Sequence, residues 1–178
     1  MTNSVMDRKA RERPEWGDRR PYRLLEKLGA QPAIGDALVA LGAVLMDELD
    51  HRTRELVALR VSAVRNSVYV WSAHSVLAHE LALTCDEIAR VTVGPTVFGG
   101  RDAAVLWAVD HVLANRPIDS AAQCELGEAV VLGVTVATKF FETVASIMQG
   151  AEPEECVVPI AGIATPAEAR GYYAVLTA

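Results

Sequence analysis

The stretch from residue 55 to residue 79 constrains the fold of this chain most, because apolar residues recur at helical spacing on both sides of one polar break. Before the break, at Arg65-Asn66-Ser67, the apolar positions are Val57, Leu59, Val61 and Val64. After it, Ser67, Val70, Trp71, His74 and Ala78 recur every three or four residues and so share one helix face. Since Asn66 or Ser67 is a suitable N-cap, the pattern predicts two consecutive helices. The second carries a histidine on an otherwise apolar face.

Helical periodicity continues along the chain, so the sequence predicts an all-α fold without an internal repeat. The other expected helices cover residues 32–49, 84–91, 102–115, 120–149 and 165–173 or beyond, with a loop at 94–100. Pro32 suits the first turn of its helix, and Thr165 begins the last one. Capping boxes are expected at 84–87 and 120–123, and Asp50 is the expected N-cap of the helix that contains Glu55. Residues 130–138 are rich in β-branched side chains, as a strand would be, but their long periodic context favours a helix. If the helix expected at 120–149 is divided in two, we expect the division at Gly127 or Gly133.

The chain of 178 residues is long enough for one domain with a sizeable core. Hydrophobic residues make up 51% and aromatic residues only 6%, which suits helices packed through alanine, valine and leucine. We expect residues 21–178 to form the domain. Residues 1–20 are charged and interrupted by Pro14 and Gly17, so we expect them to be a flexible arm.

Charge and cysteine content predict the compartment and exclude some partners. The net charge is −6, and residues 1–30 carry +3, so the remainder carries −9. A body this acidic argues against nucleic acid as a partner. The N-terminus lacks the apolar segment of a signal peptide, and no apolar run approaches the roughly 18–20 residues of a spanning helix. Cys85, Cys124 and Cys156 form no pattern, which fits a reducing compartment. The sequence therefore predicts a cytoplasmic protein without membrane or nucleic-acid partners.

Glu55, Ser67, Val70 and His74 follow the spacing of a known motif: a glutamate, two positions three residues apart, and a histidine four residues later. In this pattern the chain resembles the alkylhydroperoxidase D-like, or carboxymuconolactone decarboxylase-like, family, whose redox members have cysteines at the two middle positions. The resemblance covers roughly residues 30–152 and includes Tyr69, Trp71, residues 84–87, Gly94-Pro95 and residues 104–115. It implies an alkylhydroperoxidase D-like helical domain that assembles as a homotrimer or hexamer. The high apolar content independently suggests helix faces that one small domain cannot cover.

The departure from the family motif decides the chemistry that we expect. A dithiol peroxidase needs one thiolate to attack the peroxide and a second thiol to resolve the product, and Ser67 and Val70 provide neither. Glu55, His74 and the Ser67 hydroxyl remain as an acid–base set. A carboxylate beside an imidazole fixes its tautomer and raises its basicity, as a general base requires. We therefore expect His74 to carry the proton, Glu55 to orient it, and Ser67 to donate a hydrogen bond to substrate.

The reaction that this set suggests is decarboxylation, isomerisation or elimination of a small carbon acid. Decarboxylase-like members of the family use no metal and no organic cofactor, so the resemblance implies none here. The alternative is a non-catalytic oligomer that binds a small ligand in the former active-site cavity. A sealed core position for His74 would favour that alternative.

Other candidate residues are weaker. Val70, Trp71 and Tyr69 are the expected wall of a substrate pocket, although aromatic residues at such positions are more often core or subunit contacts. Ser67 can equally be an N-cap. His51 and Glu55 could share a metal with His74, but the chain has no His-x-x-x-His pair, so we expect no metal site. For Trp107, His111, Lys139 and Glu142 a structural role is favoured.

Overall fold

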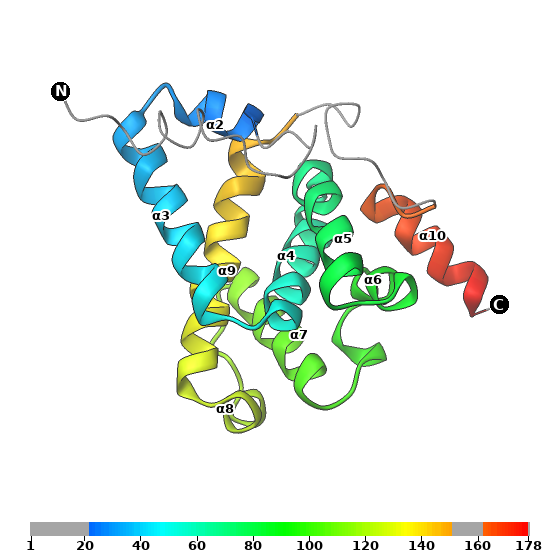
Figure 1. Cartoon of the computed structure of the whole chain (residues 1–178). Helices are drawn as coiled ribbons and strands as arrows, with labels where there is room; N and C mark the ends of the chain where they lie inside the picture. Colours follow the sequence, from blue (N-terminus) through cyan, green and yellow to red (C-terminus); the bar gives the residue numbers. More distant parts are fainter. Residues whose placement is uncertain (1–21, 151–161, 178) are drawn as a thin grey trace.

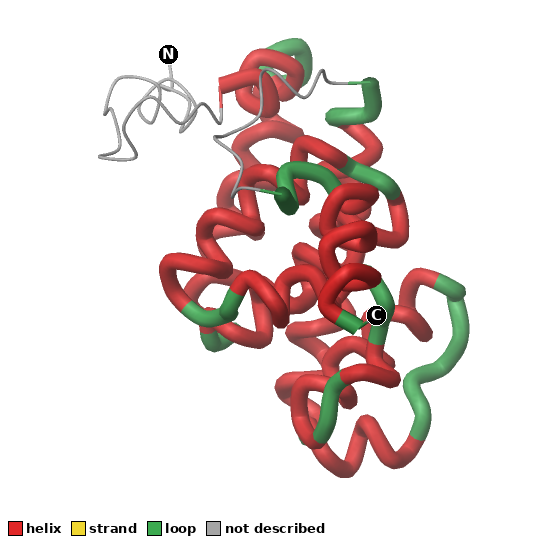
Figure 2. The backbone as a smooth tube through the Cα atoms, turned by 90° about the vertical axis from the view of Figure 1, so that its right-hand side faces the viewer, coloured by secondary structure: helices red, strands yellow, loops and turns green. Residues whose placement is uncertain are grey.

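The computed structural model describes residues 22–150 and 162–177, and within these ranges every regular element is a helix (Figure 2). In chain order the elements are α2 (Tyr22–Leu28), α3 (Pro32–Glu48), α4 (His51–Arg65), α5 (Val68–Leu81), α6 (Cys85–Val91), the 3₁₀ turn η1 (Pro95–Val97), α7 (Gly100–Leu113), α8 (Ser120–Leu126), α9 (Glu128–Ile147) and α10 (Pro166–Leu176). The predicted all-α fold is confirmed. The expected arm at residues 1–20 and Cys156 lie outside the described residues.

Helix α4 is the centre of the domain. It packs against α5, α7 and α9 more extensively than any other helix packs in the described structure, and Figure 1 shows it between α5 and α9. Leu56, Val57, Leu59 and Val61 are completely buried in the core. Ten of its 15 residues are buried, which explains why apolar positions recur along this stretch of the sequence.

The predicted break between the two central helices is confirmed, and each of its residues has a distinct role. Asn66 adopts a left-handed conformation, with φ of 53°, and ends α4. Ser67 is the N-cap of α5, and its Oγ accepts a hydrogen bond from the Val70 backbone N–H at 3.4 Å. Asp50 caps α4 as expected, accepting from the Thr53 N–H at 2.9 Å. These caps set the mutual position of the two helices that carry the candidate site.

Three details of the later helices differ from the sequence predictions. The capping box expected at residues 120–123 is wrong, because Asp119 is the N-cap of α8 and accepts from the Ala122 N–H at 2.7 Å. Of the two candidate glycines, Gly127 divides the segment, since its φ of 77° and ψ of 159° lie in a region that only glycine populates readily. Helix α7 begins at Gly100, two residues earlier than expected. The β-branched run is helical, as predicted, within α9.

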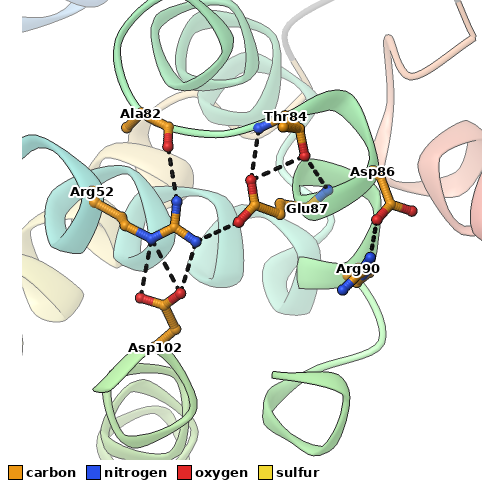
Figure 3. A network of polar contacts seen from close by, with 7 residues as sticks. All are labelled: Arg52, Ala82, Thr84, Asp86, Glu87, Arg90 and Asp102. Carbon is orange, nitrogen blue, oxygen red and sulfur yellow. Dashed lines mark hydrogen bonds and ion pairs between the residues drawn. The ribbon is translucent and has the colours of Figure 1, made fainter. Parts of the chain in front are cut away.

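A network around Arg52 fixes the start of α4, one turn before Glu55 (Figure 3). The Arg52 guanidinium donates to both carboxylate oxygens of Asp102 in α7 and to the Ala82 carbonyl, at 2.8 Å, after α5. It also pairs with Glu87, whose carboxylate accepts from the Thr84 N–H in the capping box of α6. One side chain thereby ties the first turn of α4 to α5, α6 and α7.

Helix α9 is the one helix of the described residues that is long and apolar enough, by length and composition, to cross a membrane. It has 20 residues and a mean hydropathy of 1.5, whereas we expected no segment to approach this limit. The core helix of a soluble protein meets the same criteria, and α9 packs against α3, α4, α7 and α8. This single helix is therefore weak evidence for a membrane-spanning segment.

Candidate functional site

The candidate site is built around a direct contact between α4 and α5. His74 Nδ1 lies 2.7 Å from Oε2 of Glu55. Glu55 has no exposed surface, whereas 18% of the His74 side chain is exposed. The structure therefore brings together the two residues that the motif predicted as partners, with the carboxylate inside and the imidazole reaching the surface.

Glu55 is held as a carboxylate. Burial alone would raise its pKa, but the charge and hydrogen bond of His74, and then the hydrogen bond and charge of Arg54, outweigh burial and lower the pKa below its ordinary value. The Arg54 bond runs from its Nε to Glu55 Oε1 at 3.0 Å. Both carboxylate oxygens are therefore engaged, one by each partner.

The ionised state of Glu55 fixes the tautomer of His74. A carboxylate only accepts hydrogen bonds, so the short contact requires His74 Nδ1 to carry the proton. In the neutral ring the lone pair is then on Nε2. None of the described residues forms a hydrogen bond with Nε2.

An aromatic wall covers the other side of the imidazole. The Phe141 ring of α9 meets the His74 ring edge to face, with centroids 4.8 Å apart and an interplanar angle of 79°. Phe140 packs against Phe141 in a similar way at 5.2 Å. Such apolar surroundings lower the local dielectric and strengthen the Glu55–His74 interaction.

Arg54 is a further residue of the candidate site, and the sequence did not predict it. Its side chain is nearly completely buried, and its two Nη atoms contact the Met46 carbonyl at 3.2 Å and His51 Nδ1 at 2.7 Å. The signal in the sequence was an arginine directly before Glu55 at the start of an otherwise apolar stretch. Arginine is rarely buried unless it is paired, and Glu55 is its pair.

No group of three or more histidine, cysteine, aspartate or glutamate side chains in the described part of the chain is arranged to hold a metal ion. His51, which was weighed as a ligand together with Glu55 and His74, binds the Arg54 guanidinium instead. A guanidinium between His51 and Glu55 would repel a cation. The residues present at the site therefore do not suit a metal.

Ser67 and Tyr69 line a pocket of about 450 Å³ where α5 begins and α9 ends. The other lining residues are Arg65, Asn66, Val68, Ala145, Ser146, Met148, Gln149 and Gly150. His74 is absent from this lining and lies seven residues, about 10 Å, further along α5. Phe141, Ala145 and Met148 nevertheless share one face of α9, so the pocket and His74 lie along the same α5–α9 seam.

Val70 and Trp71 are core residues in their described contacts. Val70 is almost completely buried, and Trp71 is completely buried with its Nε1–H donating to the Ile163 carbonyl at 2.8 Å. That bond anchors the segment before α10 to α5. The assignment of these two residues to a substrate pocket stays a prediction.

The four residues from later helices have contacts of a structural kind. His111 Nδ1 contacts the Pro117 carbonyl at 2.7 Å and its ring packs against Trp107. Lys139 and Glu142 form an ion pair at 2.9 Å, and Glu142 also pairs with Arg65. None of these contacts involves His74 or Glu55.

Comparison with known proteins gives one match. Residues 32–111 match the profile of the carboxymuconolactone decarboxylase family, a range that runs from α3 into α7 and contains Glu55, Ser67, Val70 and His74. No curated protein and no solved structure matches the chain.

Proposed function

We propose that this chain, whose residues 32–111 match the profile of the carboxymuconolactone decarboxylase family, is an acid–base enzyme acting on a small carbon acid. Its reaction is decarboxylation, isomerisation or elimination. Ser67 and Val70 stand where the redox type of the family has its two cysteines, so neither position offers a thiol. The proposal therefore concerns proton transfer rather than peroxide reduction.

The observation that carries this proposal is the contact between His74 and Glu55. A buried, ionised carboxylate 2.7 Å from Nδ1 holds the imidazole in one tautomer and stabilises its positive form. The His74 side chain is 18% exposed, and no described residue forms a hydrogen bond with Nε2.

The proposed mechanism uses Nε2 of His74 in both directions. In an isomerisation or elimination, its lone pair removes a proton from carbon next to a carbonyl, and the C–H electrons pass into the enolate. The enolate then takes the proton back from Nε2–H at another carbon, or it expels a leaving group from the neighbouring carbon. In a decarboxylation, Nε2 takes the proton of the substrate's carboxylic acid, the carbon–carboxylate bond breaks, CO₂ leaves, and Nε2–H protonates the resulting carbanion. Glu55 stabilises the imidazolium by its charge throughout and keeps the ring oriented.

Ser67 has the part of a hydrogen-bond donor in this proposal. Its oxygen accepts from the Val70 N–H, and its own proton has no acceptor among the described residues. Because Ser67 lies about 10 Å along α5 from His74, it would donate only to a substrate long enough to reach from His74 into the pocket that Ser67 lines. Tyr69, Val70 and Trp71 would complete the apolar side of that region.

We also propose that the chain works as a homotrimer or hexamer. Support comes from α3, where Ile34, Leu41, Val44 and Met46 expose apolar side chains, and from α9, where Leu132 is 65% exposed. Monomeric proteins rarely leave a large contiguous apolar surface in water. Packing against further copies of the chain would cover these faces.

The test is turnover of carboxymuconolactone and a panel of small β-keto acids and lactones in D₂O. Proton NMR would follow CO₂ loss, double-bond migration and deuterium entry next to the carbonyl. The variant His74→Asn keeps a side-chain N–H near the position of Nδ1, so Glu55 keeps a partner, but it has no equivalent of Nε2. We expect its turnover to fall by about 10²–10⁴-fold, with its helical content unchanged.

The matched control is His79→Asn on the same helix, since His79 contacts Cys85 rather than Glu55. We expect this control to retain wild-type turnover. Equal turnover by His74→Asn and wild type would contradict the role of His74. Absence of turnover by the wild-type protein on the whole panel, with tight binding of one of its members, would favour a ligand-binding protein instead.

A further inference from the structure

The buried charges at the site form a chain that reaches from the interior to the surface. His74 Nδ1 contacts Glu55 Oε2, Arg54 Nε donates to Glu55 Oε1, and Arg54 Nη2 contacts His51 Nδ1. The lengths are 2.7, 3.0 and 2.7 Å in that order. The acid–base mechanism above uses only the first of these contacts, and the role of Arg54 is unassigned.

The orientation of Arg54 is fixed at three points. Its Nε faces Glu55, its Nη1 donates to the Met46 carbonyl in the last turn of α3, and its Nη2 contacts His51. Arginine has donors only, so His51 Nδ1 must be an acceptor with no proton of its own. A guanidinium held by α3 and by the first residue of α4 cannot turn away from Glu55 without losing both contacts.

The charge of Arg54 matters because the site has little access to water. With Arg54 and Glu55 ionised and His74 neutral, the three side chains sum to zero charge. Without the guanidinium they would sum to −1, and one added proton would restore neutrality. The added proton can be placed in two ways, and Nε2 carries a proton in both. Either His74 becomes an imidazolium beside the Glu55 carboxylate, or Glu55 is protonated and donates to Nδ1 of a neutral His74 ring whose proton is on Nε2.

We propose that Arg54 is a positioning residue that directs Glu55 at His74 and balances its charge, so that Glu55 accepts from Nδ1 and the lone pair of the neutral ring is on Nε2. This inference rests on the proposed function for its biological meaning. Arg54 does not touch the substrate in this account and acts only through Glu55. Among the described residues, Glu55 from α4 and the uncharged Phe141 from α9 are the groups that contact the His74 ring, so Arg54 acts on His74 through Glu55.

The experiment follows the ring nitrogens of His74 by long-range proton–nitrogen NMR on histidine-labelled protein as a function of pH. No substrate is needed, so the result is independent of whether the turnover assays succeed. The signals of His74 are those missing in His74→Asn. We expect Arg54→Gln, which removes the charge but keeps a hydrogen-bond donor, to gain a proton on Nε2 at a pH about one unit higher than wild type.

Two further variants serve as controls. Arg54→Lys keeps the positive charge, so its Nε2 should gain the proton at the wild-type pH. The double variant Arg54→Gln, Glu55→Gln has no buried carboxylate to attract a proton, so its Nε2 should gain the proton at a lower pH than Arg54→Gln. It also leaves no charge unpaired, which favours folding.

Three results would overturn the proposal. The first is an Arg54→Gln protein whose Nε2 gains its proton at the same pH as in wild type. The second is an Arg54→Lys protein whose Nε2 gains its proton about one pH unit higher than in wild type. The third is a double variant whose Nε2 gains its proton at a pH no lower than in Arg54→Gln. If Arg54→Gln does not fold, Arg54→Met takes its place, because it also removes the charge and fills part of the same buried volume. The same results then decide.

Discussion

Glu55 is the residue on which the site depends, because it is ionised while completely buried. Burial opposes the charge, and the two partners, His74 and Arg54, offset that cost. Removing one member of a buried charged group usually costs about 3–5 kcal/mol of stability, since the others are left unpaired. The site therefore contributes to stability as well as to chemistry.

The first consequence is a specific sensitivity to acid. Because the pKa of Glu55 is lowered in the folded protein, its interactions contribute in full above the ordinary glutamate pKa of about 4.3. They are lost as the pH falls through the lower folded-state pKa. Urea unfolding between about pH 6 and about pH 3 should therefore show a larger loss of unfolding free energy for wild type than for Glu55→Gln.

All other acidic groups are present in both proteins, so the difference between the two slopes isolates Glu55. Near neutral pH the variant should be less stable by about 3 kcal/mol. Parallel loss of stability in the two proteins would mean that Glu55 is not ionised in the folded state.

The sequence predicted the pairing of Glu55 with His74, because the motif spacing and the apolar surroundings pointed to both residues. It did not predict Arg54. The contacts of Arg54 with Met46 and His51 depend on how the end of α3 meets the start of α4. That meeting is a tertiary feature, for which spacing along one helix gives no signal.

Among the described elements, α3 has the most large apolar side chains exposed: Ile34, Leu41, Val44 and Met46. Of its 17 residues only Gly35 and Leu45 are buried, and Ile34 is 61% exposed. Its described neighbours are α2, α4 and α9, and they cover one face. The other face is suited to contact with a second copy of the chain.

The double variant Ile34→Glu, Val44→Glu should therefore weaken assembly. Each apolar side chain buried at an interface contributes about 1.5–3 kcal/mol, and a carboxylate there would lose this and add a desolvation cost. Analytical ultracentrifugation should give a trimer or hexamer for wild type and a smaller species for the variant. Val175→Glu, at a residue that is 79% exposed on α10, is the control and should sediment as wild type.

A wild-type protein that sediments as a monomer would contradict the proposed assembly. So would an unchanged size of the double variant, which would place the interface elsewhere.

Most helices were predictable from the sequence, because caps such as Asp50, Thr84 and Thr165 are local signals. The error at the start of α8 is also local: Asp119 and Ser120 are both good N-caps, and the serine-to-glutamine spacing favoured the wrong one. The division at Gly127 rather than Gly133 was not predictable. Gly133 is instead used for close packing, since a Cβ there would lie 2.8 Å from Leu49.

For the whole molecule, the arrangement around α4 explains why a polar site can exist inside an apolar domain. The Arg52 network holds the start of α4 against α5, α6 and α7. Within the next turn of α4, the side chains of Arg54 and Glu55 lie in the interior and form an ion pair with each other. His74 then meets Glu55 from α5, the helix that packs most extensively on α4.

The most direct test of this account is the position of the ring proton on His74 in the wild-type protein, measured by long-range proton–nitrogen NMR at about pH 8, where an ordinary imidazole is neutral. A carboxylate at Nδ1 requires the proton to be on Nδ1, with Nε2 unprotonated. We expect this tautomer in the wild-type protein. A neutral ring with its proton on Nε2 would mean that Glu55 does not act as the acceptor, and would contradict the proposed role of His74 as the base.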